Sequence, residues 1–152
     1  MTQTMVLPGG VFKVTYNAGT DDSDWTYTVP TGKAWLLLYA KFDITASANA
    51  GNRHQAIDIG NGTNVFLTIY NDNNAVAATQ RGTIEIGFGE TYTVTANQLS
   101  TLSHLSVTSG IRSPIPLLYL PAGYTIRLWD ISAIHAAGDD CPHAIHYIEY
   151  DA

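Results

Sequence analysis

The residues with the clearest potential for chemistry lie near the end of the chain. His143, His146 and Glu149 follow one another at intervals of three residues. Imidazole and carboxylate groups are common metal ligands, but successive side chains of a strand point to opposite faces. The two histidines would therefore face opposite sides, and His143 and Glu149 would share a face at a separation of about 20 Å. Unless a distant histidine completes the set, this spacing predicts ordinary hydrogen-bonded or surface histidines and no metal site.

Two other groups of reactive residues have a structural interpretation as well. The single cysteine, Cys141, precedes His143 by two residues, but near neighbours in sequence seldom reach the side-chain geometry of a catalytic Cys–His pair. Asp21, Asp22 and Asp24 form an acidic turn that lacks the spacing and the closing glutamate of an EF-hand. We therefore predict a protein that is not an enzyme and needs no cofactor.

Aromatic residues raise a further alternative, because sugars stack on exposed rings. The chain contains nine tyrosines and the tryptophans Trp25, Trp35 and Trp129. In β domains such residues mostly fill cores and cross-strand pairs. A glycan-binding module therefore stays as an alternative to a purely structural protein.

Composition limits the class of protein. The chain has 152 residues, the length of one domain, and 45% of them are hydrophobic while only 13% are charged. The usual charged share is about 25%, so the low value favours a protein that packs against other subunits. The seven Lys and Arg residues are spread singly in a chain of net charge −6, which argues against a nucleic-acid partner.

The sequence also predicts neither a membrane span nor a signal peptide. The longest apolar run is far shorter than the roughly 20 residues of a membrane span, and Met1–Thr4 has no basic character typical of a signal peptide. A single cysteine fits a reducing compartment. The sequence predicts a soluble protein that folds in the cytoplasm, without a membrane partner.

The elements that must position these residues are expected to be strands. Alternating apolar and polar residues, separated by Gly, Asn and Pro turns, indicate strands at short spacing. The predicted strands are 11–16, 25–29, 34–45, 53–59, 65–70, 83–88 and 144–150. Residues 97–110 fit either an exposed connection or an irregular pair of strands. Because no helix of ten or more residues separates the strands, the fold class is all-β, a single-domain antiparallel β-sandwich.

Among sandwiches, the number of strands favours a jelly roll. An immunoglobulin-like fold is less favoured because the chain has no Cys–Trp–Cys spacing. Two similar turns stand out, one containing Pro30 and Gly32 and the other containing Pro121 and Gly123. Each precedes a long β-rich segment, which suggests one corner of the sheet built twice. The strands on either side of Pro121–Gly123 are predicted to form a hairpin.

The first ten residues are expected to form an arm that precedes a domain of residues 11–152. Met5, Val6 and Leu7 are apolar and are followed by Pro8, Gly9 and Gly10, a hinge-like sequence. Such a segment is either a frayed terminus or an arm that docks on a neighbouring subunit.

Several turn and core positions form a longer pattern. It consists of Val29-Pro30-x-Gly32-Lys33-x-Trp35-x-Leu37-Leu38, then Gly51-Asn52-Arg53, then Leu117-x-x-Leu120-Pro121-x-Gly123-Tyr124-x-Ile126-Arg127-Leu128, then Asp139-Asp140 and a closing Tyr147-Ile148-Glu149-Tyr150. The pattern resembles a group of small virion proteins of tailed bacteriophages that have a β-sandwich core. The resemblance covers roughly residues 25 to 150 and does not include residues 97–110.

This resemblance implies a structural role on the virion. Capsid decoration or cement proteins of this kind bind the head lattice as oligomers, often trimers, so the implied partners are the major capsid protein and further copies of the chain. The implied contacts are the arm residues Met5, Val6 and Leu7, with Arg53, Arg81 and Arg112 as partners for carboxylates. A tail, fibre or adaptor protein of the virion is the alternative within this class.

Overall fold

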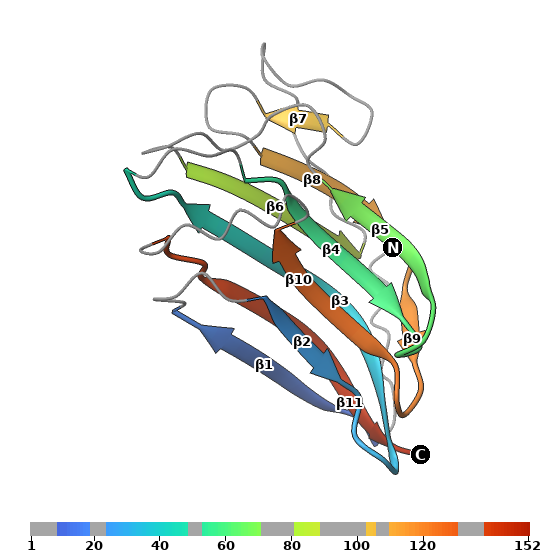
Figure 1. Cartoon of the computed structure of the whole chain (residues 1–152). Coiled ribbons are helices and arrows are strands. Elements are labelled where there is room, and N and C mark those ends of the chain that lie inside the picture. Colours follow the sequence, from blue (N-terminus) through green and yellow to red (C-terminus); the bar gives the residue numbers. More distant parts are fainter. Residues whose placement is uncertain are drawn as a thin grey trace, which may run out of the picture.

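The chain folds as two packed β-sheets in a computed structural model, which describes residues 9–18, 24–48, 53–70, 81–88, 103–105, 110–130 and 139–152. All elements of the described residues are strands, and the small sheet lies over the large one (Figure 1). The predicted all-β sandwich is confirmed. Neighbouring strands run antiparallel apart from one parallel pair, β6 and β8.

The large sheet has seven strands and the small sheet has four. The order in the large sheet is β1 (Val11–Asn17), β11 (His143–Asp151), β3 (Lys33–Thr45), β6 (Arg81–Phe88), β8 (Gly110–Ile115) and β7 (Ser103–Leu105), and β9 (Leu118–Leu120) also pairs with β3. The order in the small sheet is β2 (Trp25–Thr28), β10 (Thr125–Asp130), β4 (Gln55–Gly60) and β5 (Val65–Tyr70).

β3 is the central strand of the large sheet because it is long enough to serve three partners. It pairs with β11 along one side, and along the other side residues 39–45 pair with β6 while residues 35–37 pair with β9. Its inward residues include Leu37, Phe42 and Ile44, each at most 1% exposed. The long apolar segment predicted at 34–45 therefore forms the middle of the sandwich.

The core lies between the two sheets and consists of alternate residues from both. Alternation follows from the two-residue repeat of a strand, which turns every second side chain toward the opposing sheet. The largest buried apolar side chains are Leu37, Phe42, Ile44, Ile57, Ile59, Ile84, Ile86, Leu120, Ile126 and Leu128.

The predicted strands agree with the observed ones to within one or two residues at most ends. β5 has the predicted bounds, while β4 begins at Gln55 rather than at Arg53 and β2 ends at Thr28. In the segment left open at 97–110, the described residues 103–105 form β7, and β8 begins at Gly110. The predicted arm residues 1–8 lie outside the described residues.

The two proline–glycine turns are a pair of matching corners between the sheets. Lys33 N donates to the carbonyl of Pro30 (3.1 Å), and Tyr124 N donates to that of Pro121 (3.1 Å). Gly32 and Gly123 have φ of 73° and 83°, as the third position of a type II turn requires. One turn carries the chain from β2 to β3 and the other from β9 to β10, so each changes sheet.

The two corners lie side by side, which supports the prediction of one corner built twice. Val29 N donates to the carbonyl of Tyr124 (2.8 Å), and Gly123 N donates to that of Val29 (2.9 Å). The predicted hairpin across Pro121–Gly123 is wrong, because β9 pairs with β3 while β10 pairs with β2 and β4. A type II turn reverses the chain locally in either arrangement, and only the partner strands distinguish a hairpin from a corner.

Replacing Gly123 with alanine is expected to lower the free energy of unfolding by about 1–2 kcal/mol, because an L-residue is disfavoured at positive φ. No atom lies within 4 Å of the position that the new Cβ would take, so the loss is conformational and not steric. Urea unfolding of the variant measures it. Gly123→Asn is the matched control and should lose less, because asparagine tolerates this conformation better. Equal losses for the two variants would contradict this explanation.

Candidate functional site

The first candidate surface is the free edge of the large sheet, formed by β1. Among the described strands, β1 pairs only with β11, and it lies at the lower edge of the sandwich in Figure 1. Its apolar side chains are exposed, with Val11 at 57%, Phe12 at 59%, Val14 at 53% and Tyr16 at 67%. We refer to these four residues as the β1 strip.

The β1 strip exposes apolar groups on both faces of the strand. Phe12, Val14 and Tyr16 point to the outer face, where the ring of Phe12 meets that of His146 edge-on at 6.0 Å, and Val11 points to the opposite face. An uncovered edge strand is a template for pairing with another chain, and proteins commonly blunt it with charge or proline. β1 contains one charged residue, Lys13, and no proline. Its properties suit a surface that a partner covers.

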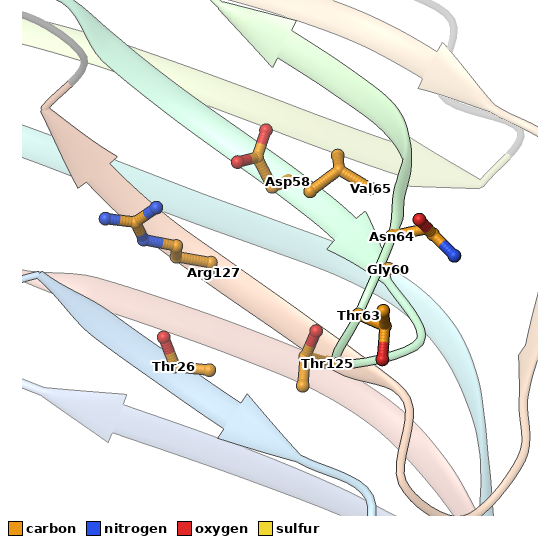
Figure 2. A pocket seen from close by; sticks show the side chains of 9 residues that line it. Thr26, Asp58, Gly60, Thr63, Asn64, Val65, Thr125 and Arg127 are labelled. Atoms are coloured by element: carbon orange, nitrogen blue, oxygen red, sulfur yellow. The ribbon is translucent and has the colours of Figure 1, made fainter.

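The second candidate surface is a pocket of about 200 Å³ on the outer face of the small sheet. Its walls come from β2, β10, β4, the turn between β4 and β5, and the first residue of β5 (Figure 2). The lining residues are Thr26, Asp58, Gly60, Gly62, Thr63, Asn64, Val65, Thr125 and Arg127. These positions alternate with the core residues of the same strands, which places them on the face away from the large sheet.

The turn between β4 and β5 is held by one side chain. Oδ1 of Asn61 accepts hydrogen bonds from the backbone N–H groups of Thr63 (3.1 Å) and Asn64 (2.7 Å). Gly62 has a φ of 82°, a left-handed conformation that glycine adopts readily. Gly60 allows a close approach instead, because a Cβ there would lie 2.5 Å from the carbonyl oxygen of Asn64. The turn therefore forms a defined wall of the pocket.

Two opposite charges line this pocket without pairing with each other. Asp58 and Arg127 are direct cross-strand neighbours in the register of β4 and β10. Nη2 of Arg127 instead donates to Oδ2 of Asp24 (2.6 Å), and the guanidinium lies 4.0 Å above the ring of Trp129. Asp58 is 6% exposed and accepts a hydrogen bond from Oγ1 of Thr68 (2.7 Å) through one oxygen. The pocket thus offers a buried carboxylate beside a guanidinium that is already neutralised.

Most of the predicted contact residues lie where their side chains are not described. Met5, Val6 and Leu7 are outside the described residues. Arg81 begins β6, and Arg112 lies in β8 opposite Glu85 in register. Their side chains are outside the described part of the chain, so their roles as contacts stay predictions.

The predicted contact role of Arg53 is corrected by the structure. Arg53 is 0% exposed, and its Nε and Nη2 donate to Oδ2 and Oδ1 of Asp139 at 2.7 Å and 2.9 Å. Backbone N–H of Ser47 donates to the same carboxylate (2.7 Å). The guanidinium is therefore committed to its own chain and is not available to a carboxylate of a partner.

The two histidines of β11 face opposite sides, as the spacing predicts. His143 is buried, and its Nε2 lies 2.6 Å from the hydroxyl oxygen of Tyr27. His146 faces outward and contacts the rings of Phe12 and Tyr39. Within the described residues, no group of three His, Cys, Asp or Glu side chains is arranged to hold a metal ion.

Cys141 and two of the three tryptophans have structural positions. Cys141 is buried in the core, and its carbonyl, not its thiol, contacts Nδ1 of His143 (3.1 Å). Trp35 is 5% exposed and stacks on Tyr147 at 4.1 Å. Trp25 packs against the core and meets the ring of His143 at 4.9 Å. Trp25 and Trp35 therefore fill the core, as such rings mostly do in β domains, and do not form the stacking platform of the glycan-binding alternative.

Sequence reasoning missed both candidate surfaces, although signals for each were present. β1 has apolar residues at adjacent positions, Val11 and Phe12, which a strand with one solvated face does not need. The pocket residues come from four strands and a turn, so they meet only once the pairing of β2, β10, β4 and β5 is known. Asp58 was the best signal, as an acidic residue between two isoleucines of a strand.

No protein-family model and no curated protein sequence matches this chain. Among the described residues, no helix is long and apolar enough to cross a membrane.

Proposed function

We propose that this chain is a structural protein of a tailed-bacteriophage virion, a capsid decoration or cement protein that binds and stabilises the head lattice. Its partners are the major capsid protein and other copies of the chain, assembled as a homotrimer on the capsid surface. The role is binding and not catalysis, and it involves neither nucleic acid nor a membrane. The observation that carries the proposal is the β1 strip.

A cement protein works by adding buried contact area between subunits, and stable contacts bury about 1,600 Å² in total. The outer side of the β1 strip pairs with no other described strand, and its four apolar side chains are at least half exposed. It also follows directly on the N-terminal arm, since β1 begins at Val11. Gly10 packs against the side chains of Ile148 and Tyr150. Arm and strip are adjacent in the sequence, and we assign both to the contact with a partner.

The strand order supports the jelly roll that the sequence favours. β1, β11, β3 and β6 lie in that order in the large sheet, and β2, β10, β4 and β5 lie in that order in the small sheet. The chain changes sheet between β1 and β2, β2 and β3, β3 and β4, β5 and β6, β9 and β10, and β10 and β11. We propose that these eight strands form the double Greek key of a jelly roll, with β7, β8 and β9 as additions to the large sheet.

Replacing Val14 with lysine is expected to abolish both self-assembly and binding to heads. A charge placed in the middle of an apolar contact is desolvated without a partner, which should weaken binding by at least about a hundredfold. The measurements are light scattering, where a trimer has three times the 16.4 kDa of one chain, and cosedimentation with heads of the parent phage that lack the protein. Removing residues 1–8 should weaken binding to heads while the domain stays folded.

Val65→Lys is the matched control, because Val65 is 57% exposed on β5, at the edge of the other sheet. This variant should assemble and bind heads like the wild-type protein. Head binding that survives Val14→Lys would overturn the role of the β1 strip. Binding of the wild-type protein to tails but not to heads would replace the decoration function with that of a tail, fibre or adaptor component.

A further inference from the structure

We infer that the pocket on the outer face of the small sheet binds a neutral saccharide unit, with Asp58 as the central hydrogen-bond acceptor. This site goes beyond the decoration function and does not depend on it. The β1 strip lies on the edge of the large sheet, whereas the pocket opens on the outer face of the small sheet. A copy attached through β1 could present the pocket to a second ligand.

Asp58 is buried and only partly hydrogen-bonded. The residue is 6% exposed, although buried carboxylates normally have all their oxygens hydrogen-bonded. Oδ1 accepts from Thr68, and no other hydrogen bond or ion pair of the Asp58 side chain is found among the described residues. The other oxygen, Oδ2, is not fully enclosed by protein atoms, so a ligand can reach it. The free oxygen therefore faces the pocket, where a ligand hydroxyl can donate to it.

The charges at the pocket disfavour an anionic ligand. Arg127 lies on the neighbouring strand, but its guanidinium is already balanced by Asp24 at 2.6 Å and packs on Trp129. Figure 2 shows Arg127 and Asp58 projecting from their adjacent strands on the same face. The uncompensated charge of the pocket is therefore that of Asp58. An anionic ligand would be repelled, which excludes phosphates and acidic sugars.

The walls of the pocket carry groups that can form hydrogen bonds with a sugar. Thr26, Thr63 and Thr125 contribute hydroxyl groups and Asn64 contributes an amide, so the walls offer both donors and acceptors. A sugar carries hydroxyl groups that act in both ways at once. The pocket volume of about 200 Å³ is smaller than the ~300 Å³ at which pockets for drug-sized ligands begin. A pocket of this size suits one sugar ring.

Apolar surface for the C–H face of a sugar lies beside the polar walls. Val65 lines the pocket, and the next residue, Phe66, is 53% exposed. The ring of Phe66 lies 5.6 Å from that of Tyr124, which packs against the core, so Val65 is the apolar residue of the pocket lining itself.

The test is a titration of the ¹⁵N-labelled full chain with D-glucose, D-galactose, D-mannose and N-acetyl-D-glucosamine, followed by amide chemical shifts. At least one of these sugars should shift the amides of Asp58, Asn64 and Arg127 in a saturable manner. D-glucuronate, which differs from glucose by a carboxylate, should bind at least about tenfold more weakly than glucose if glucose binds, because of the repulsion by Asp58.

Asp58→Asn is expected to weaken sugar binding by about tenfold or more, because it removes a charged acceptor while keeping the shape of the side chain. Thr125→Val, which removes one wall hydroxyl, should weaken it by roughly fivefold. Thr28→Val is the matched control, since Thr28 is an exposed threonine of β2 that does not line the pocket, and it should bind like wild type.

The proposal is overturned if none of the four sugars gives saturable shifts, or if wild type and both pocket variants bind equally. It is also overturned if glucuronate binds more tightly than glucose, or if methylammonium alone shifts the pocket amides, which would indicate a cation site. A native amide spectrum for each variant shows that a loss of binding is not a loss of fold. Failure of this test leaves the head-binding test of Val14→Lys unaffected.

Discussion

Replacing Arg53 with methionine is expected to lower the free energy of unfolding by about 3–5 kcal/mol, because it leaves a buried carboxylate without its countercharge. Arg53 is fully buried and forms a two-pronged ion pair with Asp139, at 2.7 Å and 2.9 Å. Methionine retains much of the side-chain volume, so the loss reports the charge more than the packing. Urea unfolding followed by tryptophan fluorescence measures it.

Two further variants separate the charge from other effects. Arg53→Met combined with Asp139→Asn removes both charges and keeps an acceptor for Ser47 N–H, so it should be more stable than Arg53→Met alone. Lys33→Met is the surface control, since Lys33 and Asp151 form an exposed ion pair, and it should change stability little. A double variant no more stable than Arg53→Met would show that packing, and not the buried charge, causes the loss.

The pH dependence of this difference gives a second readout. Burial raises the pKa of Asp139, but the hydrogen bonds from Arg53 and Ser47 outweigh it and hold the pKa below its usual value. A carboxyl with a depressed folded pKa stabilises the fold above its unfolded pKa and loses this contribution as the pH falls through the folded value. Without Arg53, burial should raise the pKa. The stability difference between wild type and Arg53→Met should therefore shrink as the pH falls from the raised pKa of Asp139 in the variant to its lowered pKa in the wild type.

Local sequence patterns were sufficient for the strands and for the turns. Alternation identified most strands to within one or two residues, and proline followed two positions later by glycine identified both corner turns. These features depend on the few residues that form them. The same patterns contain no information about partner strands, which is why Pro121–Gly123 was predicted to be a hairpin turn although it joins the two sheets.

The candidate surfaces depend on contacts between residues far apart in the sequence. Arg53 is charged and was expected on the surface, but it lies 86 positions from Asp139, the carboxylate that makes its burial possible. Asp58 and Arg127 likewise become neighbours only through the pairing of β4 with β10. The opposite orientations of His143 and His146 could be predicted, in contrast, because the two-residue repeat of a strand is sufficient to fix them.

The second prediction of a large loss of stability concerns the two histidines of β11. His143→Ala is expected to lower the free energy of unfolding by about 3–4 kcal/mol, from a cavity in the core and an unsatisfied hydroxyl. The carbonyl of Cys141 can only accept, so Nδ1 of His143 donates to it (3.1 Å) and Nε2 accepts from the hydroxyl of Tyr27 (2.6 Å). Burial, and secondarily Tyr147, raises the pKa of Tyr27, which keeps that hydroxyl protonated as the donor.

His146→Ala is the matched control, because it makes the same change three residues along the same strand on the opposite face. His146 has only partial burial and packs edge-on against Phe12 at 6.0 Å and obliquely against Tyr39 at 5.0 Å, so its loss should be about 1 kcal/mol or less. Tyr27→Phe should recover part of the stability of His143→Ala, since it removes the hydroxyl left unsatisfied. Equal losses for the two histidines would contradict a buried structural role for His143.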